Sequence, residues 1–425
     1  MKKLLSIVLA LLMIVGCFAF AACGKKEDDK STDTSANAGD TNAGDDTAAA
    51  DDKFADLKIG FIFLHDEKST YDLNFLNAAK AAQAALGLSD EQVILKTNIP
   101  ESNDCYEAAA DLADMGCDIV FANSFGHEAF MIQAAMEFPE VQFCHATGTM
   151  AHTEGLDNFH NAFANIYEGR YLAGVAAGLK LNAMIEAGEF TAEEAKIGYV
   201  GAFTYAEVIS GYTSFYLGAK SVCPSVTMDV QFTGSWYDAP AEREAALALI
   251  NGGCKLISQH ADSMGAPSAC EENGIPNVSY NGSTVETCPN TFIISSAINW
   301  QPYFEYIANC VADGEAIAAD WCAGIEEGSV VLAEINDTVA AEGTAAKLDE
   351  VKAALADGTL HVFDTATFTV GGETLTSYMA DVDTDAAYEK DTEVIADGYF
   401  HESEYRSAPY FDIQIDGITL LNTEF

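Results

Sequence analysis

Side chains suited to holding a flat ligand follow several apolar stretches of this 425-residue chain. The aromatic members could stack on a planar ring, and the hydroxyl, amide and carboxylate members could hydrogen-bond to its polar edge. Trp236 is the most informative, because its neighbours are loop residues and an exposed tryptophan calls for a partner. The predicted ligand-binding residues are Tyr71, Ser124, Phe125, Tyr205, Trp236, Asp262, Asn281 and Trp300.

Three of these residues have a competing structural interpretation. Phe125 and Tyr205 could each cover the hydrophobic core. Asp262 could cap the helix that follows it, because Ser263 and Pro267 are typical of a helix start. The residue types leave these alternatives open.

Motifs for catalysis and metal binding are missing from the sequence. GxSxG, HExxH and SxxK do not occur, and His65–Asp66 has no nucleophile placed beside it. His260 and Asp262 lack a third metal ligand nearby, and there is no CxxC pair. We therefore predict a protein that is not an enzyme and has neither a metal site nor a cofactor.

The elements that must position the candidate residues occur twice. Residues 57–64 predict a buried strand, 65–72 a polar loop and 74–86 a helix closed by Gly87. The stretches 58–62, 108–117 and 119–125 are echoed by 196–201, 245–254 and 256–262. An offset of about 137 residues is far longer than a solenoid period. It predicts an α/β fold of two similar, doubly wound parallel-sheet lobes with a hinge and a binding cleft between them.

Other apolar stretches predict the remaining elements. Strands are expected at 92–98, 117–122, 141–146 and 329–335, and helices at 101–116, 130–138, 167–181, 303–311 and 338–356. Residues 290–300 are expected to cross back to the first lobe. Residues 360–363 and 368–370, with the Gly371–Gly372 turn before Thr374–Leu375, predict hairpin strands.

The N-terminus resembles a bacterial lipoprotein signal. Lys2 and Lys3 precede an apolar run too short for a comfortable membrane span, and small residues lead to Cys23. We expect cleavage before Cys23 and acylation of its thiol; Cys17 is a weaker candidate, and a plain secretory signal is the alternative. Residues 24–53 contain no large apolar residue and predict a disordered tether. The protein would then be anchored by lipid at the outer face of the bacterial cytoplasmic membrane.

These features divide the chain into five predicted segments. They are the signal peptide (1–22), the lipidated cysteine and acidic tether (23–54), an N-terminal lobe (55–180, rejoined by about 292–330), a C-terminal lobe (190–291) and an acidic, Tyr-rich end that completes the lobes (331–425).

Charge and cysteine content restrict the partners. The net charge of −46, from 66 acidic against 20 basic residues, argues against nucleic acid and anionic lipid surfaces. Of the 11 cysteines, nine remain after Cys17 and Cys23 are set aside, and an odd number forbids complete pairing. No disulfide is assigned.

Several motifs together resemble one known family. Residues 161–174 (NAFANIYEGRYLAG), 143–148 (FCHATG) and 259–263 (QHADS) are similar to signatures of the basic membrane protein family of lipoproteins. The resemblance implies a type I periplasmic-binding-protein fold and a monomeric substrate-binding protein of an ABC importer. Such a protein would capture purine nucleobases or nucleosides and deliver them to permease subunits. The segments around Trp236 and 259–263 look most like the adenine-binding branch.

Two departures from that family affect the expected ligand. The aromatic of the first loop, usually Trp in the adenine-binding branch, is Tyr71, and the positions matching the ribose-binding Asp and Lys of the nucleoside branch are Asn281 and Asn299. The uncharged Asn281 and Asn299 disfavour ribose recognition and favour a free base or another small planar ligand. A carboxylate at Asp262 would prefer adenine to hypoxanthine, because only adenine offers an exocyclic amino donor. The alternatives are a sensory lipoprotein with the same lobes and a surface nucleoside hydrolase.

Overall fold

The computed structural model describes residues 52–385, 387 and 389–425. The expected signal peptide, Cys17, Cys23 and almost all of the tether lie outside the described residues.

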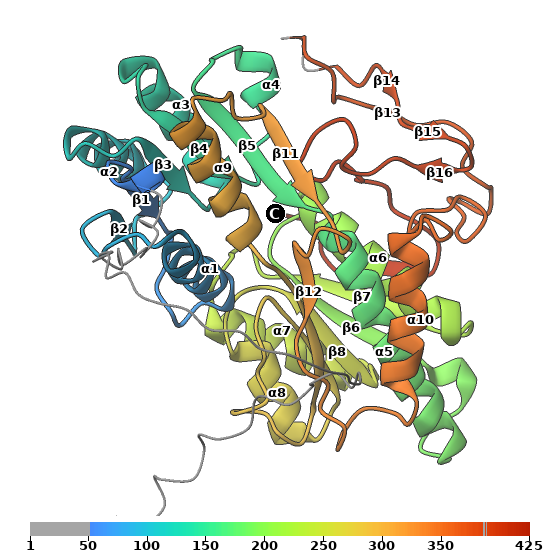
Figure 1. Cartoon of the computed structure of the whole chain (residues 1–425). Coiled ribbons are helices and arrows are strands. Elements are labelled where there is room, and N and C mark those ends of the chain that lie inside the picture. The colour runs from blue at the N-terminus through green and yellow to red at the C-terminus, as the bar shows by residue number, and fades with distance from the viewer. Residues whose placement is uncertain (1–51, 386, 388) are drawn as a thin grey trace, which may run out of the picture. The chain divides into compact units, whose positions relative to one another are not determined.

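Two separate β-sheets form the framework (Figure 1). The first has the order β11-β5-β4-β3-β1-β2 and is entirely parallel. Its strands are β1 (Ile59–Ile62), β2 (Val93–Lys96), β3 (Ile119–Ala122), β4 (Gln142–Ala146), β5 (Phe159–Ala164) and β11 (Asp320–Ala323).

The second sheet has the order β12-β10-β9-β8-β6-β7-β17 and is parallel except for β12 against β10. Its strands are β6 (Lys196–Gly201), β7 (Thr227–Phe232), β8 (Leu256–His260), β9 (Asn277–Tyr280), β10 (Phe292–Ile298), β12 (Val330–Leu332) and β17 (Ile418–Leu420). The order β5-β4-β3-β1-β2 of the first sheet therefore recurs as β10-β9-β8-β6-β7. This confirms the predicted pair of similar lobes.

Helices cover both faces of each sheet, as doubly wound folds require. In the first lobe α1 contacts α9 and α2 contacts α3; in the second α5 contacts α6 and α7 contacts α8. Their bounds are α1 (Thr70–Leu86), α2 (Asn103–Asp114), α3 (Glu128–Glu137), α4 (Ala151–Glu154), α5 (Ile166–Glu186), α6 (Ala206–Val222), α7 (Ala239–Asn251), α8 (Gly265–Asn273), α9 (Gln301–Asp313) and α10 (Thr344–Ala356).

The first strand–loop–helix unit shows how local sequence sets these elements. All four residues of β1 are buried, as expected for an apolar strand covered on both faces. α1 begins where the Ser69 side chain accepts a hydrogen bond from the Asp72 backbone N–H. It ends at Gly87, whose φ of 70° lies in the left-handed region that favours glycine. The loop between them is thereby fixed at the carboxyl end of β1.

Glycines bring α5 and α6 into close contact. A Cβ on Gly174 would lie 2.0 Å from the backbone oxygen of Phe215, and one on Gly218 would lie 2.0 Å from that of Tyr171. Only a residue without a side chain permits this approach. The small-residue helix predicted at 167–181 is therefore confirmed, and it packs against a second helix of the same character.

Several local predictions differ from the structure. Residues 292–298 form β10 of the second sheet, so the chain returns to the first lobe only at about residues 299–300, where α9 begins. The helix expected from 338 begins at Thr344, because Gly343 has a φ of 82° that a helix cannot contain. No strand was predicted at β5, β7, β9, β11 or β17.

The predicted hairpin strands at 360–363 and 368–370 do not form. The only pairings there among the described residues are single bridges, Asp364 with Tyr399 and Val370 with Glu373 across the Gly371–Gly372 turn. The rest of this end has two-residue strands: β13 (Met379–Ala380) with β14 (Thr392–Glu393), and β15 (Ile395–Ala396) with β16 (Tyr399–Phe400).

The nine cysteines of the described part are all unpaired, and eight of them are buried. This agrees with their apolar sequence surroundings. Within the same residues, no helix has both the length and the apolar character needed to span a membrane.

Candidate functional site

One pocket lies where the carboxyl ends of strands from both sheets meet. Its lining residues come from the loops or ends of β1, β3, β4, β6, β7, β8 and β9: Leu64, Tyr71, Ser124, Phe125, Thr147, Glu207, Trp236, His260, Asp262 and Tyr280. The carboxyl ends of parallel strands are where open α/β sheets bind ligands. The pocket encloses about 340 Å³ of space between atoms, including open space at its mouth.

The structure brings five of the eight predicted residues to this pocket: Tyr71, Ser124, Phe125, Trp236 and Asp262. Tyr205 lies immediately beside it, with its ring stacked on Phe125 at 5.0 Å and 39% of its surface exposed. Neither Phe125 nor Tyr205 is buried in a core, so the alternative in which they cover one is not what the structure contains.

Trp300 and Asn281 are not among the lining residues. Trp300 is 0% exposed and stacks on Phe75 at 4.5 Å inside the first lobe, so it supports the hydrophobic core and not a ligand. Asn281 follows β9 with a φ of 61°, and its backbone N–H donates to Ser296 O. The preceding residue, Tyr280, reaches the pocket instead. Asn299 is also absent from the lining.

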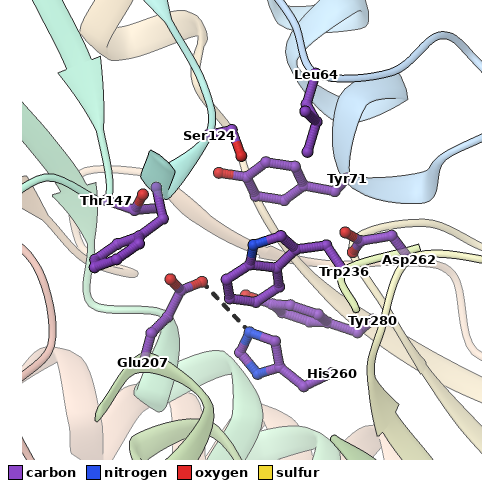
Figure 2. Close-up of a pocket in the computed structure, with 10 residues that line it drawn as sticks. Leu64, Tyr71, Ser124, Thr147, Glu207, Trp236, His260, Asp262 and Tyr280 are labelled. Carbon is purple, nitrogen blue, oxygen red and sulfur yellow. Dashed lines mark hydrogen bonds and ion pairs between the residues drawn. The ribbon is translucent and has the colours of Figure 1, made fainter. Parts of the chain in front are cut away.

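Aromatic rings form the walls of the pocket. Figure 2 shows Tyr71, Trp236 and Tyr280 close together around the same space. The Tyr71 hydroxyl donates to Asn123 O at 2.6 Å, which fixes that ring. Trp236 is supported from behind by Phe203, in an edge-to-face contact of 5.0 Å. Rings held in this way present rigid surfaces on which a planar molecule can stack.

Asp262 supplies an acceptor that the protein itself leaves free. Its backbone N–H donates to Trp236 O and its backbone oxygen accepts from Thr70 N, but its carboxylate makes no hydrogen bond to any described residue. It does not cap α8, whose first amide, that of Gly265, donates to Ser263 Oγ. Burial, with the charges of Asp72, Glu242 and Glu207, raises the pKa of Asp262 well above its usual value.

Glu207 and His260 form a second polar pair in the wall. The two side chains are joined at 3.4 Å through His260 Nε2 (Figure 2). Burial lowers the pKa of His260 despite the nearby carboxylate. The ring is therefore neutral at pH 7 and carries its proton on Nε2, where it donates to Glu207.

Two further hydroxyl groups in the lining have no partner among the described residues. They belong to Thr147 and Tyr280, and both side chains are buried. Burial raises the pKa of Tyr280 well above its usual value, so the phenol stays a donor at neutral pH. Buried polar groups normally find a partner, so these two are available for a ligand.

The lining contains two carboxylates and no lysine or arginine. Such a site repels phosphates and attracts groups that donate hydrogen bonds. Among the described residues, one cluster has the spacing to hold a metal ion, Asp383, Asp385 and Asp391. It lies near the C-terminal end, is mostly exposed and is not part of the pocket.

The two lobes touch at the rim of the pocket. The Thr70 backbone N–H donates to Asp262 O at 3.0 Å, and the rings of His65 and Tyr237 lie 5.3 Å apart. These contacts, together with Phe125 on Tyr205, join residues that follow strands of opposite sheets. The lobes therefore enclose the pocket from both sides.

Sequence reasoning missed Leu64, Thr147, Glu207 and Tyr280. Each lies at or just after the carboxyl end of a strand, which is the signal that could have identified it. Glu207 was the hardest to recognise, because an acidic residue in the first turn of a helix is common for its effect on the helix dipole alone.

Comparison with known proteins assigns the chain to a family. The family described as "ABC transporter substrate-binding protein PnrA-like" matches residues 77–359, more than half of the chain. The chain belongs to this family. The predicted resemblance is confirmed, and the PnrA-like chain is a substrate-binding protein of the ABC transporter class, a class that binds small molecules and works with a permease.

Three relatives illustrate the range of this class. A purine-binding protein of Brucella abortus (strain 2308) is 32% identical over 284 residues, which cover 66% of this chain and 76% of the relative. A putative ABC transporter glucose-binding protein of Haloferax volcanii is 30% identical over 263 residues, 61% of this chain and 63% of the relative. The nucleoside-binding protein BmpA of Lactococcus lactis is 34% identical over 101 residues, 23% of this chain and 25% of the relative.

Solved structures confirm the fold. A solute-binding protein of an ABC transporter system from Aeropyrum pernix K1 has a TM-score of 0.60 at 17% identity and covers 72% of this chain and 93% of its own. One from Conexibacter woesei has a TM-score of 0.59 at 18% identity, with coverage of 72% and 98%. The PnrA-like chain thus has the two-lobed fold of type I periplasmic binding proteins, as predicted.

Proposed function

We propose that this PnrA-like protein captures a purine nucleobase or nucleoside, with adenine-like bases preferred, and delivers it to an ABC permease. It would act at the outer face of the bacterial cytoplasmic membrane, held there by a lipid on Cys23. The ligand would lie between the aromatic walls contributed by both lobes.

The observation that carries this proposal is the combination of rigid aromatic walls with a free carboxylate. Tyr71 and Trp236 come from opposite lobes and line one space with Asp262. A purine offers two flat faces for the rings and, in adenine, an exocyclic amino group for the carboxylate. No basic residue lines the pocket itself, so a phosphate held inside the pocket would have no counter-charge there.

A hinge accounts for how such a ligand would enter. Three segments connect the two sheets, leading from β5 into α5, from β10 into α9 and from β11 to β12. Rotation about them would separate Thr70 from Asp262 and Phe125 from Tyr205, which are the contacts that close the rim. Rejoining around the ligand would place a stacking ring on each of its sides.

Calorimetry on the purified domain tests the ligand. We expect adenine to bind, and glucose, named for the Haloferax relative, to give no heat of binding. Trp236→Ala should weaken adenine binding by at least about tenfold, because one stacking face is lost. Trp321→Ala is the matched control: that residue is also half-buried but packs on Tyr303 and Tyr306 outside the pocket, so affinity should not change.

Binding of glucose without any purine would refute the proposed ligand. Unchanged adenine affinity in Trp236→Ala would remove Trp236 from the site. Incubation of the domain with purine nucleosides should release no free base; turnover would favour the hydrolase alternative. Loss of purine uptake on deletion of the gene separates an importer component from a sensory lipoprotein, whose loss would leave uptake intact.

Cell fractionation tests the anchor. Cys23→Ala should release the protein from the membrane fraction, while Cys17→Ala should leave it membrane-bound and labelled by a radioactive fatty acid. Retention of the label in Cys23→Ala would contradict the predicted attachment.

A further inference from the structure

A second chamber adjoins the pocket, and one of its walls lies outside the family match. The two spaces share Phe125, Thr147 and Glu207. The chamber encloses about 540 Å³ between atoms, including its mouth, against about 340 Å³ for the pocket. Its lining also includes Arg406, Ala408 and Pro409, which lie beyond the matched residues 77–359.

The segment that carries Arg406 is tied firmly to the lobes. Ser407 donates through both its backbone N–H and its hydroxyl to Asp320 Oδ1, at 2.8 and 2.5 Å, which attaches the segment to β11. Glu402 Oε2 accepts from the backbone N–H groups of Tyr410 and Phe411. The chamber therefore has a built wall, with Arg406 held between these two anchors.

Arg406 has hydrogen-bonding capacity to spare. Its guanidinium donates to three backbone oxygens, those of Asp381 at 3.1 Å, Ala408 at 3.4 Å and Pro409 at 3.4 Å. A guanidinium has five N–H donors, so two remain for another partner. Its positive charge is stabilised by the nearby Glu402, Asp320 and Asp381, although no carboxylate of the described residues forms an ion pair with it.

The chamber also contains polar side chains that carry no positive charge. Glu207 is an acceptor, and the buried Thr147 hydroxyl has no partner among the described residues. The Tyr205 and Phe125 rings, stacked on each other, add an apolar surface. A hydroxyl group both donates and accepts, so a substituent carrying several hydroxyls matches a chamber lined by both a carboxylate and a guanidinium.

We infer that the C-terminal segment extends the binding site, and that Arg406, which lines the second chamber together with Glu207, binds an uncharged, hydroxyl-bearing substituent attached to the ring held in the pocket. This inference rests on the proposed function and specifies its ligand as a base that carries a sugar. It also shows why Asn281 and Asn299 do not decide the question, since neither lines the pocket or the chamber.

Calorimetry with adenine, adenosine and adenosine 5′-monophosphate tests the inference. We expect adenosine to bind about tenfold more tightly than adenine or better, and the monophosphate to bind more weakly than adenosine, because Glu207 would repel the added charge. Arg406→Met should abolish the advantage of adenosine and leave adenine affinity unchanged. Arg406→Lys, which keeps the charge, should retain part of the advantage.

Two features keep the test interpretable. Adenine affinity reports whether the pocket is intact in each variant, and Arg243→Met is the matched control, because that arginine pairs with Glu272 at an exposed site outside both spaces. If adenine and adenosine bind equally, or if Arg406→Met weakens both by the same factor, the inference is wrong while the proposed function stands. If no purine binds, the proposed function fails first. Tightest binding of the monophosphate would overturn the uncharged character of the substituent.

Discussion

We expect Asp262→Asn to weaken adenine binding and, at neutral pH, to raise the free energy of unfolding. Asp262 is 6% exposed and its carboxylate has no hydrogen-bond donor among the described residues. An adenine amino group would supply that donor. The substitution removes the negative charge and replaces one acceptor oxygen by an amide that itself donates, so it should weaken adenine binding and favour hypoxanthine, which has a carbonyl oxygen at that position.

The expected size of the binding effect follows from the charge of the acceptor. A hydrogen bond to a charged group contributes about 1.5–3 kcal/mol net, which corresponds to roughly 10- to 150-fold in affinity. Hypoxanthine affinity should be unchanged or higher. The ratio of adenine to hypoxanthine affinity should therefore fall by at least about tenfold in the variant.

The stability effect has the opposite sign. The pKa of Asp262 is raised in the folded protein, first by burial and then by Asp72, Glu242 and Glu207. The free energy of unfolding is therefore highest below the unfolded pKa, near pH 4, and is lost as the pH rises through the folded pKa. The amide that replaces the carboxyl group in Asp262→Asn does not titrate. The variant should therefore be more stable than wild type at neutral pH and equal to it near pH 4.

Chemical denaturation between pH 4 and 8 measures the stability, and calorimetry at neutral pH measures the two affinities. Wild-type adenine affinity should also rise with pH until Asp262 is ionised in the free protein, with proton release on binding, whereas the variant should show a flat profile. An equal loss of affinity for adenine and hypoxanthine would refute the role of Asp262 in reading the amino group. Lower stability of the variant at pH 7 would refute the account of its buried charge.

Three further substitutions test the framework. Arg170→Lys should lower the free energy of unfolding by about 2 kcal/mol, because a lysine cannot reach Tyr199, Ser258 and Ser279 together as the guanidinium does; unchanged thermal unfolding would contradict this. Gly218→Ala should cost roughly 1–3 kcal/mol by forcing α5 and α6 apart, and a wild-type melting temperature would show that the helices can adjust. Tyr71→Phe loses one hydrogen bond but keeps its ring, so adenine affinity should change by less than about threefold; a larger loss would mean that the hydroxyl contacts the ligand.

The repeat in the sequence predicted the two lobes, but local patterns could not assign every strand to its sheet. The run from Phe292 to Ile298 is apolar and buried, as its composition indicates, yet its partner β9 is set by pairing between distant residues. The acidic end lacks periodicity, and its bridges and two-residue strands depend on contacts such as Asp364 with Tyr399. The sequence predicted hairpin strands at 360–363 and 368–370 beside the Gly371–Gly372 turn, but only single bridges form there.

The same limit applies to the site. Trp236 and Trp300 both follow apolar strands, and sequence alone offered no means to separate them. What distinguishes them is the neighbouring α1: Phe75 on that helix stacks on Trp300 at 4.5 Å and completes a core, whereas Trp236 is backed by Phe203 and keeps a face toward the pocket. A position at the carboxyl end of a strand predicts that a residue lies at the ligand-binding edge of the sheet. Whether its side chain is buried in the core or open to the pocket depends on elements far away in the chain.

A buried cation lies next to the acidic pocket. Arg170 is fully buried and has no carboxylate of the described residues within ion-pairing distance; its guanidinium lies against the rings of Tyr199, Phe215 and Tyr280 at 4.9–5.5 Å. Tyr280 in turn lines the pocket with Glu207. In a medium of low dielectric constant, an uncompensated cation favours negative charge nearby and the pocket carboxylates favour the cation. The charge of Arg170 acts on the lining groups beside it: it opposes the burial that raises the pKa of Tyr280 and adds to the burial that lowers the pKa of His260.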